Sequence, residues 1–135
     1  MAVPRILLVD DDPEDRDVLV DALEQLLAGN EIMCAENGEA ALALLNKSAA
    51  AGKKPCLIVL DLNMPRMNGT ETLKTLKADA RFQEIAVVIY STSINPIEKE
   101  VCKNLGAHSY VTKPTTYKES LVTARMFLDL CNSNL

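Results

Sequence analysis

Three short segments of the chain are hydrophobic at every position, and this pattern restricts the fold more than any other feature of the sequence. They span residues 6–9, 57–60 and 87–90. A strand with one face in water alternates hydrophobic and polar residues, whereas a strand covered on both faces is hydrophobic throughout. The three segments therefore predict inner strands of a parallel sheet that lies between two layers of helices.

Longer amphipathic stretches alternate with these and two further strand-like segments. The expected strands span residues 5–9, 31–35, 56–60, 86–90 and 109–111. The expected helices span about residues 13–27, 38–46, 69–79, 96–105 and 116–131, and residues 47–55 are interpreted as an extended surface connection. Five strand–helix repeats predict one α/β domain, a doubly wound five-stranded parallel sheet flanked by five helices. We expect this single domain to fill residues 1–135, with no output domain.

Residue types at the expected helix ends support this division. Asp12 and Asn95 are N-cap residue types, and each precedes a proline, which is favoured in the first turn because it lacks an N–H. Gly29 and Gly106 follow expected helices, at positions where glycine commonly ends a helix. The last helix carries one apolar stripe, most of which we expect to pack on the sheet. It is formed by Tyr117, Leu121, Ala124, Leu128 and Cys131 and widened by Phe127 and Leu130.

The composition excludes several classes of protein. Lys and Arg number 14 and Asp and Glu number 19, so the net charge of −5 argues against direct binding to nucleic acid. No apolar run approaches the roughly 18 residues of a membrane span, and the N-terminal residues lack a signal-peptide layout. We therefore expect a cytoplasmic protein that does not associate with a membrane. The cysteines form no CxxC pair and are interpreted as small buried residues in a reducing compartment: Cys34, Cys56, Cys102 and Cys131.

The chain contains one histidine, His108, which argues against a histidine-rich metal site and against Ser-His or Cys-His catalysis. The remaining chemistry must therefore come mainly from carboxylates. In an open parallel sheet, ligands bind beyond the carboxyl ends of the strands. Residues 10–12 are all aspartates and follow the first strand, while Asp61 follows the third. Ser91 follows the fourth strand and Lys113 follows the fifth, so we expect these side chains to meet at one edge.

Carboxylates gathered so closely repel one another unless a cation lies between them. Oxygen ligands without histidine favour Mg²⁺ (or Mn²⁺) over zinc, and Mg²⁺ commonly keeps open positions for a phosphoryl group. Lys113 and the hydroxyl of Ser91 complete a clamp for phosphate oxygens, and one carboxylate is left to act as a nucleophile. Alternatively, these residues only cap helices and form turns, and this is the interpretation we prefer for Asp12.

Four segments together resemble the receiver domains of two-component response regulators, with the chemotaxis-type, flavodoxin-like fold. They are LLVDDDPEDR, DLNMPRMNG, YSTS and LGAHSYVTKP, and the resemblance runs from about residue 5 to the last helix. These segments also resemble those of stand-alone receivers that are paired with hybrid or phytochrome-like kinases.

The resemblance assigns a role to each matching residue. It makes Asp61 the phosphoacceptor and Asp11 a direct Mg²⁺ ligand, with Asp10 acting through water. The backbone carbonyl of Asn63 would also bind the metal, and Asn63 and Ser93 lie at positions that tune loss of the phosphoryl group.

The remaining assignments concern the switch. Ser91 would contact the phosphoryl group, Lys113 would pair with it, and Tyr110 falls at the aromatic switch position. The peptide bond between Lys113 and Pro114 is expected to be cis, as in the family.

The expected function is acceptance of a phosphoryl group from the phosphohistidine of a sensor histidine kinase onto Asp61, with Mg²⁺ required. Such a chain is not an enzyme in the usual sense, since it catalyses only its own phosphorylation and dephosphorylation. The response would be a shift in the fourth helix, fifth strand and fifth helix. The signal would pass to a downstream protein target or a phosphotransfer protein, from a monomer or a phosphorylation-linked dimer.

Two alternatives remain. A Mg²⁺-dependent phosphohydrolase of the haloacid-dehalogenase type also uses an aspartyl nucleophile, and Asp10 and Asp12 match its DxD spacing, but Pro13 replaces the hydroxyl-bearing loop. The other alternative is a receiver-like adaptor that is never phosphorylated. A nucleotide-binding module is disfavoured, because the first turn is acidic and contains no glycine.

Overall fold

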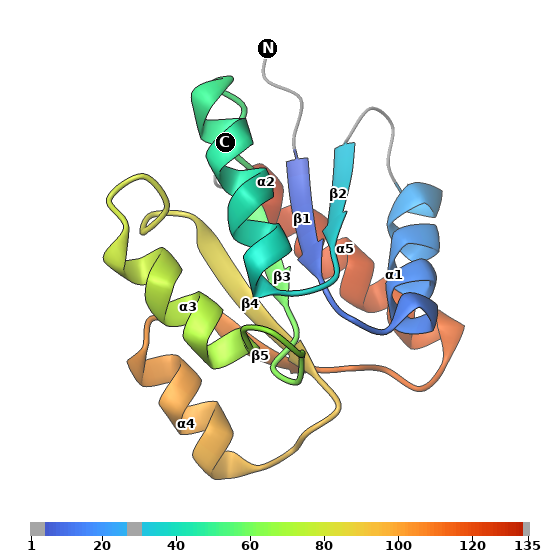
Figure 1. Ribbon diagram of the computed structural model, residues 1–135. Helices are drawn as coiled ribbons and strands as arrows, with labels where there is room; N and C mark the ends of the chain where they lie inside the picture. The colour runs from blue at the N-terminus through green and yellow to red at the C-terminus, as the bar shows by residue number, and fades with distance from the viewer. Residues whose placement is uncertain (1–4, 27–30, 134–135) are drawn as a thin grey trace.

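Five parallel strands form one sheet in the order β2-β1-β3-β4-β5, as the hydrophobic segments predict (Figure 1). This computed structural model describes residues 5–26 and 31–133. The strands are β1 (Arg5–Val9), β2 (Glu31–Ala35), β3 (Leu57–Leu60), β4 (Ala86–Ser91) and β5 (Ser109–Thr112). The helices within the described residues are α1 (Pro13–Leu26), α2 (Gly38–Ala50), α3 (Gly69–Ala78), α4 (Pro96–Asn104) and α5 (Tyr117–Ser133). The doubly wound α/β prediction is therefore confirmed.

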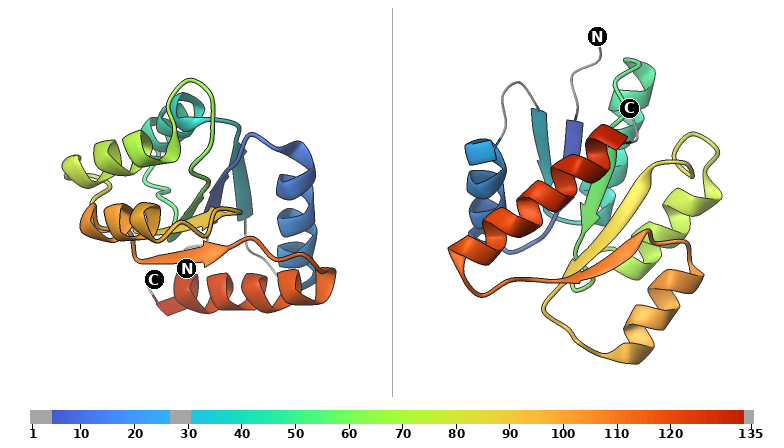
Figure 2. Two further views of the ribbon diagram at one scale, coloured as in Figure 1. Left: turned by 90° about the horizontal axis from the view of Figure 1, so that it is seen from below. Right: turned by 180° about the vertical axis from the view of Figure 1, so that it is seen from behind.

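The inner strands are hydrophobic throughout because both faces of the sheet are covered. Leu7 and Ile58 pack into a core beneath α2, α3 and α4, whereas their neighbours Leu8 and Val59 pack into a second core beneath α1 and α5. All four of these side chains are fully or almost fully buried. Figure 2 shows the same division, with α1 and α5 on one face of the sheet and the other three helices opposite.

Some boundaries differ from those expected. The helix α2 continues to Ala50, so the first part of the segment interpreted as an extended connection is helical. Three consecutive alanines at residues 49–51 explain the extension, because alanine has the highest helix propensity. Similarly, α5 runs to Ser133, two residues beyond the expected end. Among the described residues, no helix is both long and apolar enough to cross a membrane.

The cap residues predicted for the helix ends are confirmed where they lie in the described part of the chain. The Asp12 Oδ1 atom accepts hydrogen bonds from the N–H groups of Glu14 and Asp15, at 2.9 and 3.3 Å. Asn95 caps α4 through the N–H of Ile97. Gly106 follows the same helix with a φ of 100°, a conformation that glycine adopts readily. Gly29 lies outside the described residues.

The apolar stripe of α5 packs on the sheet over most of its length. Ala124, Leu128 and Cys131 are buried, and Phe127 lies edge-on to the ring of Tyr90 with 5.6 Å between centroids. Tyr117 is the exception within the stripe and is 44% exposed. Tyr117 occupies the first position of the helix, where the stripe extends past the edge of its core.

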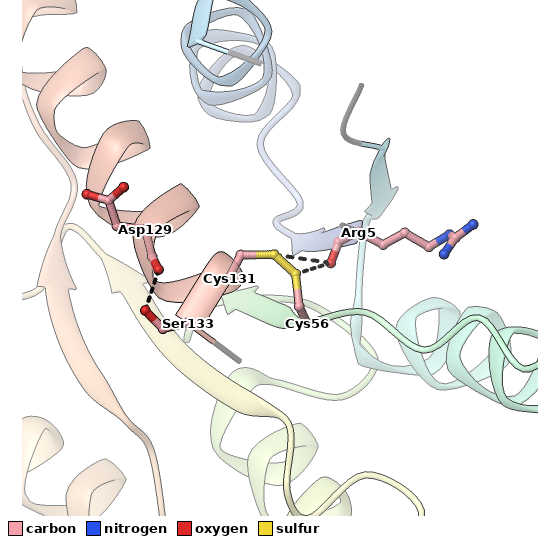
Figure 3. Close-up of a disulfide and its surroundings, with 5 residues drawn as sticks. All are labelled: Arg5, Cys56, Asp129, Cys131 and Ser133. Carbon is pink, nitrogen blue, oxygen red and sulfur yellow. Dashed lines mark hydrogen bonds between the residues drawn. A yellow bond between two sulfur atoms is a disulfide. The ribbon is translucent and has the colours of Figure 1, made fainter. Parts of the chain in front are cut away.

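The cysteines differ from the interpretation as four separate buried thiols. Cys56 and Cys131 are joined as a disulfide, with their Cα atoms 5.1 Å apart (Figure 3). Cys34 is exposed and Cys102 is buried. This Cα separation lies within the range that disulfides span. The bond links the start of β3 to the end of α5. Neither segment carries a CxxC spacing, so the pairing depends on tertiary packing that the sequence pattern does not show.

We expect iodoacetamide to label two thiols, Cys34 and Cys102, when the protein is purified and unfolded without reductant. Prior reduction should raise the number to four, the number of cysteines in the sequence. Intact-mass spectrometry counts the adducts directly. In Cys131→Ser, Cys56 loses its partner and should become a third labelled thiol without reduction. Labelling of all four thiols in the unreduced protein would contradict the pairing.

Candidate functional site

The register of the sheet places two acidic residues side by side at its carboxyl edge. Val9 of β1 is paired with Leu60 of β3, and Asp10 and Asp61 directly follow them. The backbone fixes both residues further, since the Asp61 N–H donates to the Val9 carbonyl at 2.9 Å and the Asp10 N–H donates to the Ala35 carbonyl at 3.0 Å. Asp10 is 1% exposed and Asp61 is 6% exposed. With the exposed Asp11, they bring three carboxylate oxygens within 4.8 Å of one another.

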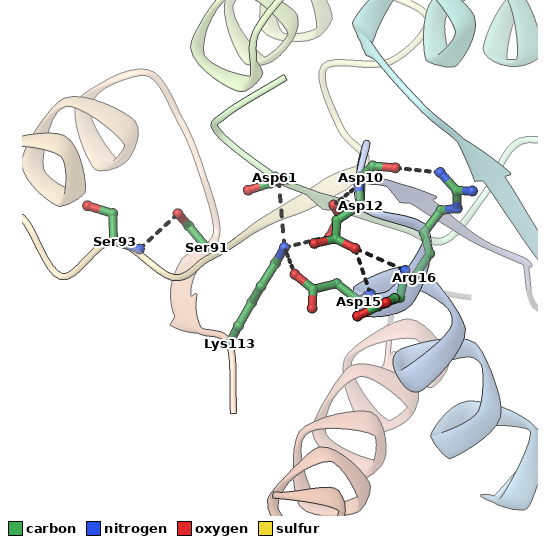
Figure 4. A network of polar contacts seen from close by, with 9 residues as sticks. Asp10, Asp12, Asp15, Arg16, Asp61, Ser91, Ser93 and Lys113 are labelled. Carbon is green, nitrogen blue, oxygen red and sulfur yellow. Dashed lines mark hydrogen bonds and ion pairs between the residues drawn. The ribbon is translucent and has the colours of Figure 1, made fainter. Parts of the chain in front are cut away.

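The ammonium group of Lys113, the residue after β5, faces these carboxylates. The Nζ atom of Lys113 lies 2.7 Å from Asp10 Oδ2, 2.8 Å from Asp15 Oδ2 and 3.7 Å from Asp61 Oδ2 (Figure 4). The backbone of Lys113 is held in place next to β4, because its N–H donates a hydrogen bond to the carbonyl of Ser91 at 2.9 Å. The structure thus brings Asp10, Asp11, Asp61 and Lys113 together, as predicted. The Ser91 side chain was expected in the same group, but within the described residues its hydroxyl is hydrogen-bonded to Ser93.

Burial and charge shift the ionisation of this cluster. Burial raises the pKa of Asp61 to about 6, and the nearby charge of Asp10 acts in the same direction. The charge of Lys113 and hydrogen bonds from the backbone N–H groups of Leu62 and Asn63 oppose the rise. For Lys113, burial alone would lower the pKa, but hydrogen bonds to Asp10 and Asp15 and the charge of Asp61 outweigh it and raise the pKa. The site is thus a tightly coupled group of charges around one cation.

The acidic side of this cluster fits a hard divalent cation. Its three carboxylates offer oxygen ligands, the type that Mg²⁺ and Mn²⁺ prefer. The buried Asp10 Oδ2 atom has the ion pair with Lys113 at 2.7 Å, and no other described residue donates a hydrogen bond to it. Asp11 adds an exposed carboxylate on the solvent side. Asp10, Asp11 and Asp61 could therefore hold a metal, with Asn63 nearby in sequence as the expected carbonyl ligand.

The two expected switch residues contact the same connection between β4 and α4. Ser91 is fully buried at the end of β4, and its Oγ atom accepts a hydrogen bond from the Ser93 N–H at 3.2 Å. Tyr110 is half-buried, and its hydroxyl donates to the carbonyl of Ser93 at 2.9 Å. A displacement of Ser91 would therefore act on the backbone segment to which Tyr110 is bonded.

A glycine lets α3 begin directly against the backbone that follows β3. A Cβ atom at Gly69 would collide with the backbone carbonyl oxygen of Asp61 and with the Cα atom of Leu62. The Gly69 N–H also donates to the Leu62 carbonyl at 3.0 Å. In the sequence, Gly69 is interpreted only as the first residue of a helix, although a glycine eight residues after an acid at a strand end is a usable signal for close packing.

Two aspects of the site differ from the sequence analysis. The bond between Lys113 and Pro114 was expected to be cis but is trans, like every other peptide bond in the described residues. Trans is the intrinsically favoured isomer. Asp15, in the first turn of α1, has no role in the site predicted above, yet it is an ion-pair partner of Lys113. Arg16 was not considered, and its Nη1 atom donates to the backbone carbonyl of Asp10 at 2.9 Å.

Topology and site together define a class of protein. A parallel sheet in the order β2-β1-β3-β4-β5 with an acidic cluster and a lysine beyond its carboxyl ends is the flavodoxin-like receiver fold. Residues 6–125 match the response regulator receiver domain family. The chain belongs to this family and is a receiver domain of two-component signalling.

Relatives of this family cover most of the chain. Protein PilH of Pseudomonas aeruginosa is 35% identical over 124 residues, which make up 92% of this chain and 97% of PilH. Chemotaxis protein CheY1 of Helicobacter pylori is 30% identical over 112 residues, 83% of this chain and 86% of CheY1. The transcriptional regulatory protein AruR of Pseudomonas aeruginosa is 32% identical over 123 residues, but the match spans only 48% of its length against 91% of this chain.

Solved structures show the same similarity in three dimensions. The phosphorylated cyanobacterial phytochrome response regulator RcpA superposes with a TM-score of 0.89 at 29% identity, covering 99% of this chain and 97% of RcpA. The Mn²⁺-bound form of response regulator Rcp1 gives a TM-score of 0.81 at 29% identity, covering 91% of this chain and 90% of Rcp1.

Proposed function

We propose that this chain accepts a phosphoryl group on Asp61 from the phosphohistidine of a sensor histidine kinase, in a Mg²⁺-dependent reaction. The observation that carries the proposal is the position of the Asp61 carboxylate, which belongs to an acidic group suited to a cation and lies 3.7 Å from the ammonium of Lys113. The family supports this assignment, and the RcpA structure is described as phosphorylated.

The residues of the chain each contribute a defined part of this transfer. With a pKa of about 6, Asp61 is mostly ionised at pH 7, so an oxygen lone pair is available to attack phosphorus. The new O–P bond forms as the P–N bond to the kinase histidine breaks, and the imidazole leaves with the electron pair of that bond. Lys113 neutralises charge on the phosphoryl oxygens, and Ser91 offers its hydroxyl as a donor. When bound, Mg²⁺ would supply further positive charge at the same oxygens.

The proposed output is a change in α4, β5 and α5. Phosphoryl transfer would draw Ser91 and Lys113 inward, and the hydrogen bond between Tyr110 and Ser93 connects this movement to β5. Ile97 and Val101 are exposed on α4, where a downstream target protein or a phosphotransfer protein could read the change. The chain would thus act as a cytoplasmic switch, monomeric or dimeric after phosphorylation, that catalyses only its own phosphorylation and dephosphorylation. The phytochrome response regulators among its structural neighbours favour a phytochrome-like kinase.

The test is intact-mass spectrometry after incubation with acetyl phosphate, with and without Mg²⁺. We expect one phosphoryl adduct that requires both Mg²⁺ and Asp61, so Asp61→Asn should carry none. Asp17→Asn makes the same chemical change at an exposed position of α1 and should be phosphorylated normally. If neither acetyl phosphate nor a kinase phosphorylates the protein and Mg²⁺ does not bind, the adaptor alternative replaces this proposal.

A further inference from the structure

Lys113 is shared unequally among the carboxylates that surround it. Its Nζ atom is within hydrogen-bond range of Asp10 and Asp15, at 2.7 and 2.8 Å, but is 3.7 Å from the Asp61 oxygen. A hydrogen bond between an ammonium and a carboxylate is commonly 2.7–2.9 Å long, so the Asp61 contact is an ion pair without a hydrogen bond. Two carboxylates therefore hold the ammonium, and the expected phosphoacceptor is not one of them.

The two carboxylates that hold Lys113 differ in their freedom. Asp10 is buried, and its other oxygen, Oδ1, accepts a hydrogen bond from the Asp12 N–H at 3.0 Å. The Asp15 side chain is 41% exposed and belongs to the first turn of α1. Asp15 and Lys113 also line a cavity of about 310 Å³ together with Tyr90 and Tyr117, so Asp15 has room to turn away without repacking of the core.

We propose that Asp15 is a positioning residue that holds Lys113 away from Asp61 before phosphoryl transfer and competes with the phosphoryl group for the ammonium. This inference rests on the proposed function of Asp61. When a phosphoryl group arrives, Lys113 exchanges its hydrogen bond with Asp15 for one with a phosphoryl oxygen. The free state is thereby stabilised relative to the phosphorylated state by the contact between Asp15 and Lys113.

The competition makes a directional prediction for Asp15→Asn. Removing the charge of Asp15 destabilises only the free state, in which Asp15 pairs with Lys113. The equilibrium should therefore shift toward the state that carries the phosphoryl group or its analogue. We expect beryllofluoride, a phosphoryl analogue, to bind about 2- to 5-fold more tightly in the presence of Mg²⁺, the size expected from losing one partly exposed ion pair. Isothermal titration calorimetry measures this affinity for each variant.

Three controls separate positioning from general effects. Asp17→Asn removes the same charge from an exposed position on α1 and should leave the affinity unchanged, which excludes a simple effect of net charge. Asp15→Glu keeps the carboxylate and should restore most of the original affinity. In a Lys113→Ala background, Asp15→Asn should have no further effect, because the residue through which Asp15 acts is absent.

Each remaining outcome decides against a stated claim. If the unsubstituted chain binds no beryllofluoride and takes no phosphoryl group, the proposed function fails and this inference falls with it. If it does bind, but Asp15→Asn matches Asp17→Asn, then Asp15 does not compete for Lys113. Weaker binding by Asp15→Asn would also overturn the inference, because it would mean that Asp15 directs Lys113 toward the phosphoryl group.

Discussion

Replacing Lys113 with alanine is expected to destabilise the metal-free protein by about 3–5 kcal/mol at pH 7, the usual cost of removing one partner from a buried ion pair. Lys113 is 9% exposed and lies within 4.0 Å of three carboxylates, two of which are almost fully buried. Without the ammonium, Asp10 and Asp61 would repel each other with no cation between them. Urea unfolding in EDTA, compared with the unsubstituted protein, measures the loss.

The size of this effect should depend on Asp61 and on metal. In Lys113→Ala/Asp61→Asn, one of the two buried charges is absent, so the double variant should recover a large part of the lost stability. Added Mg²⁺ should also stabilise Lys113→Ala, because the acidic group that we expect to bind the ion is intact. We further expect this variant to bind Mg²⁺ but not to couple phosphorylation to α4 and α5. A loss of less than 1 kcal/mol, unchanged by Asp61→Asn, would contradict the charge cluster described here.

Asp61→Asn alone should have the opposite sign and stabilise the metal-free protein by roughly 1–3 kcal/mol at pH 7. The pKa of Asp61 is about 6 in the folded chain, above its ordinary value of 3.8. Folding therefore favours the protonated form, and this group loses its stabilising contribution as the pH rises through about 6. Asparagine does not ionise, so the advantage of the variant should be absent near pH 4 and complete above pH 7.

Thermal unfolding in EDTA across this pH range tests the prediction. Asp17→Asn is again the matched control, because it changes the same atoms at an exposed site and should give a nearly constant difference with pH. A melting temperature for Asp61→Asn below that of the unsubstituted protein at pH 7 would show that Asp61 is not under repulsive strain. An advantage that does not change between pH 4 and pH 7 would assign the stabilisation to something other than ionisation.

The parts of the site that follow from strand order were predictable from the sequence. Asp10 and Asp61 directly follow buried strands, and parallel strands present their carboxyl ends at one edge, so their meeting needs no knowledge of packing. The same argument places Lys113 after β5. The helix ends at Asp12 and Asn95 were predictable for a similar reason, because a cap acts on residues two or three positions away.

The features that were missed depend on how elements far apart in sequence pack together. Asp15 meets Lys113 across 98 residues of sequence, and this contact depends on the position of α1 relative to the end of β5. The bond between Cys56 and Cys131 likewise spans 75 residues and links a strand to the last helix. Neither residue pair has a local pattern that identifies its partner, so the sequence could suggest the residue types but not the contacts.

The disulfide has a mechanical consequence for α5. It fixes the end of the helix to the residue that precedes β3 (Figure 3). The first residue of the helix, Tyr117, lies four positions after Lys113 in the sequence. We therefore expect the helix to pivot about Cys131, which the disulfide holds in place. A displacement that starts at Lys113 would be largest at Tyr117 and would shrink toward the C-terminal end. A partner protein that binds the first two turns of α5 would therefore distinguish the two states best.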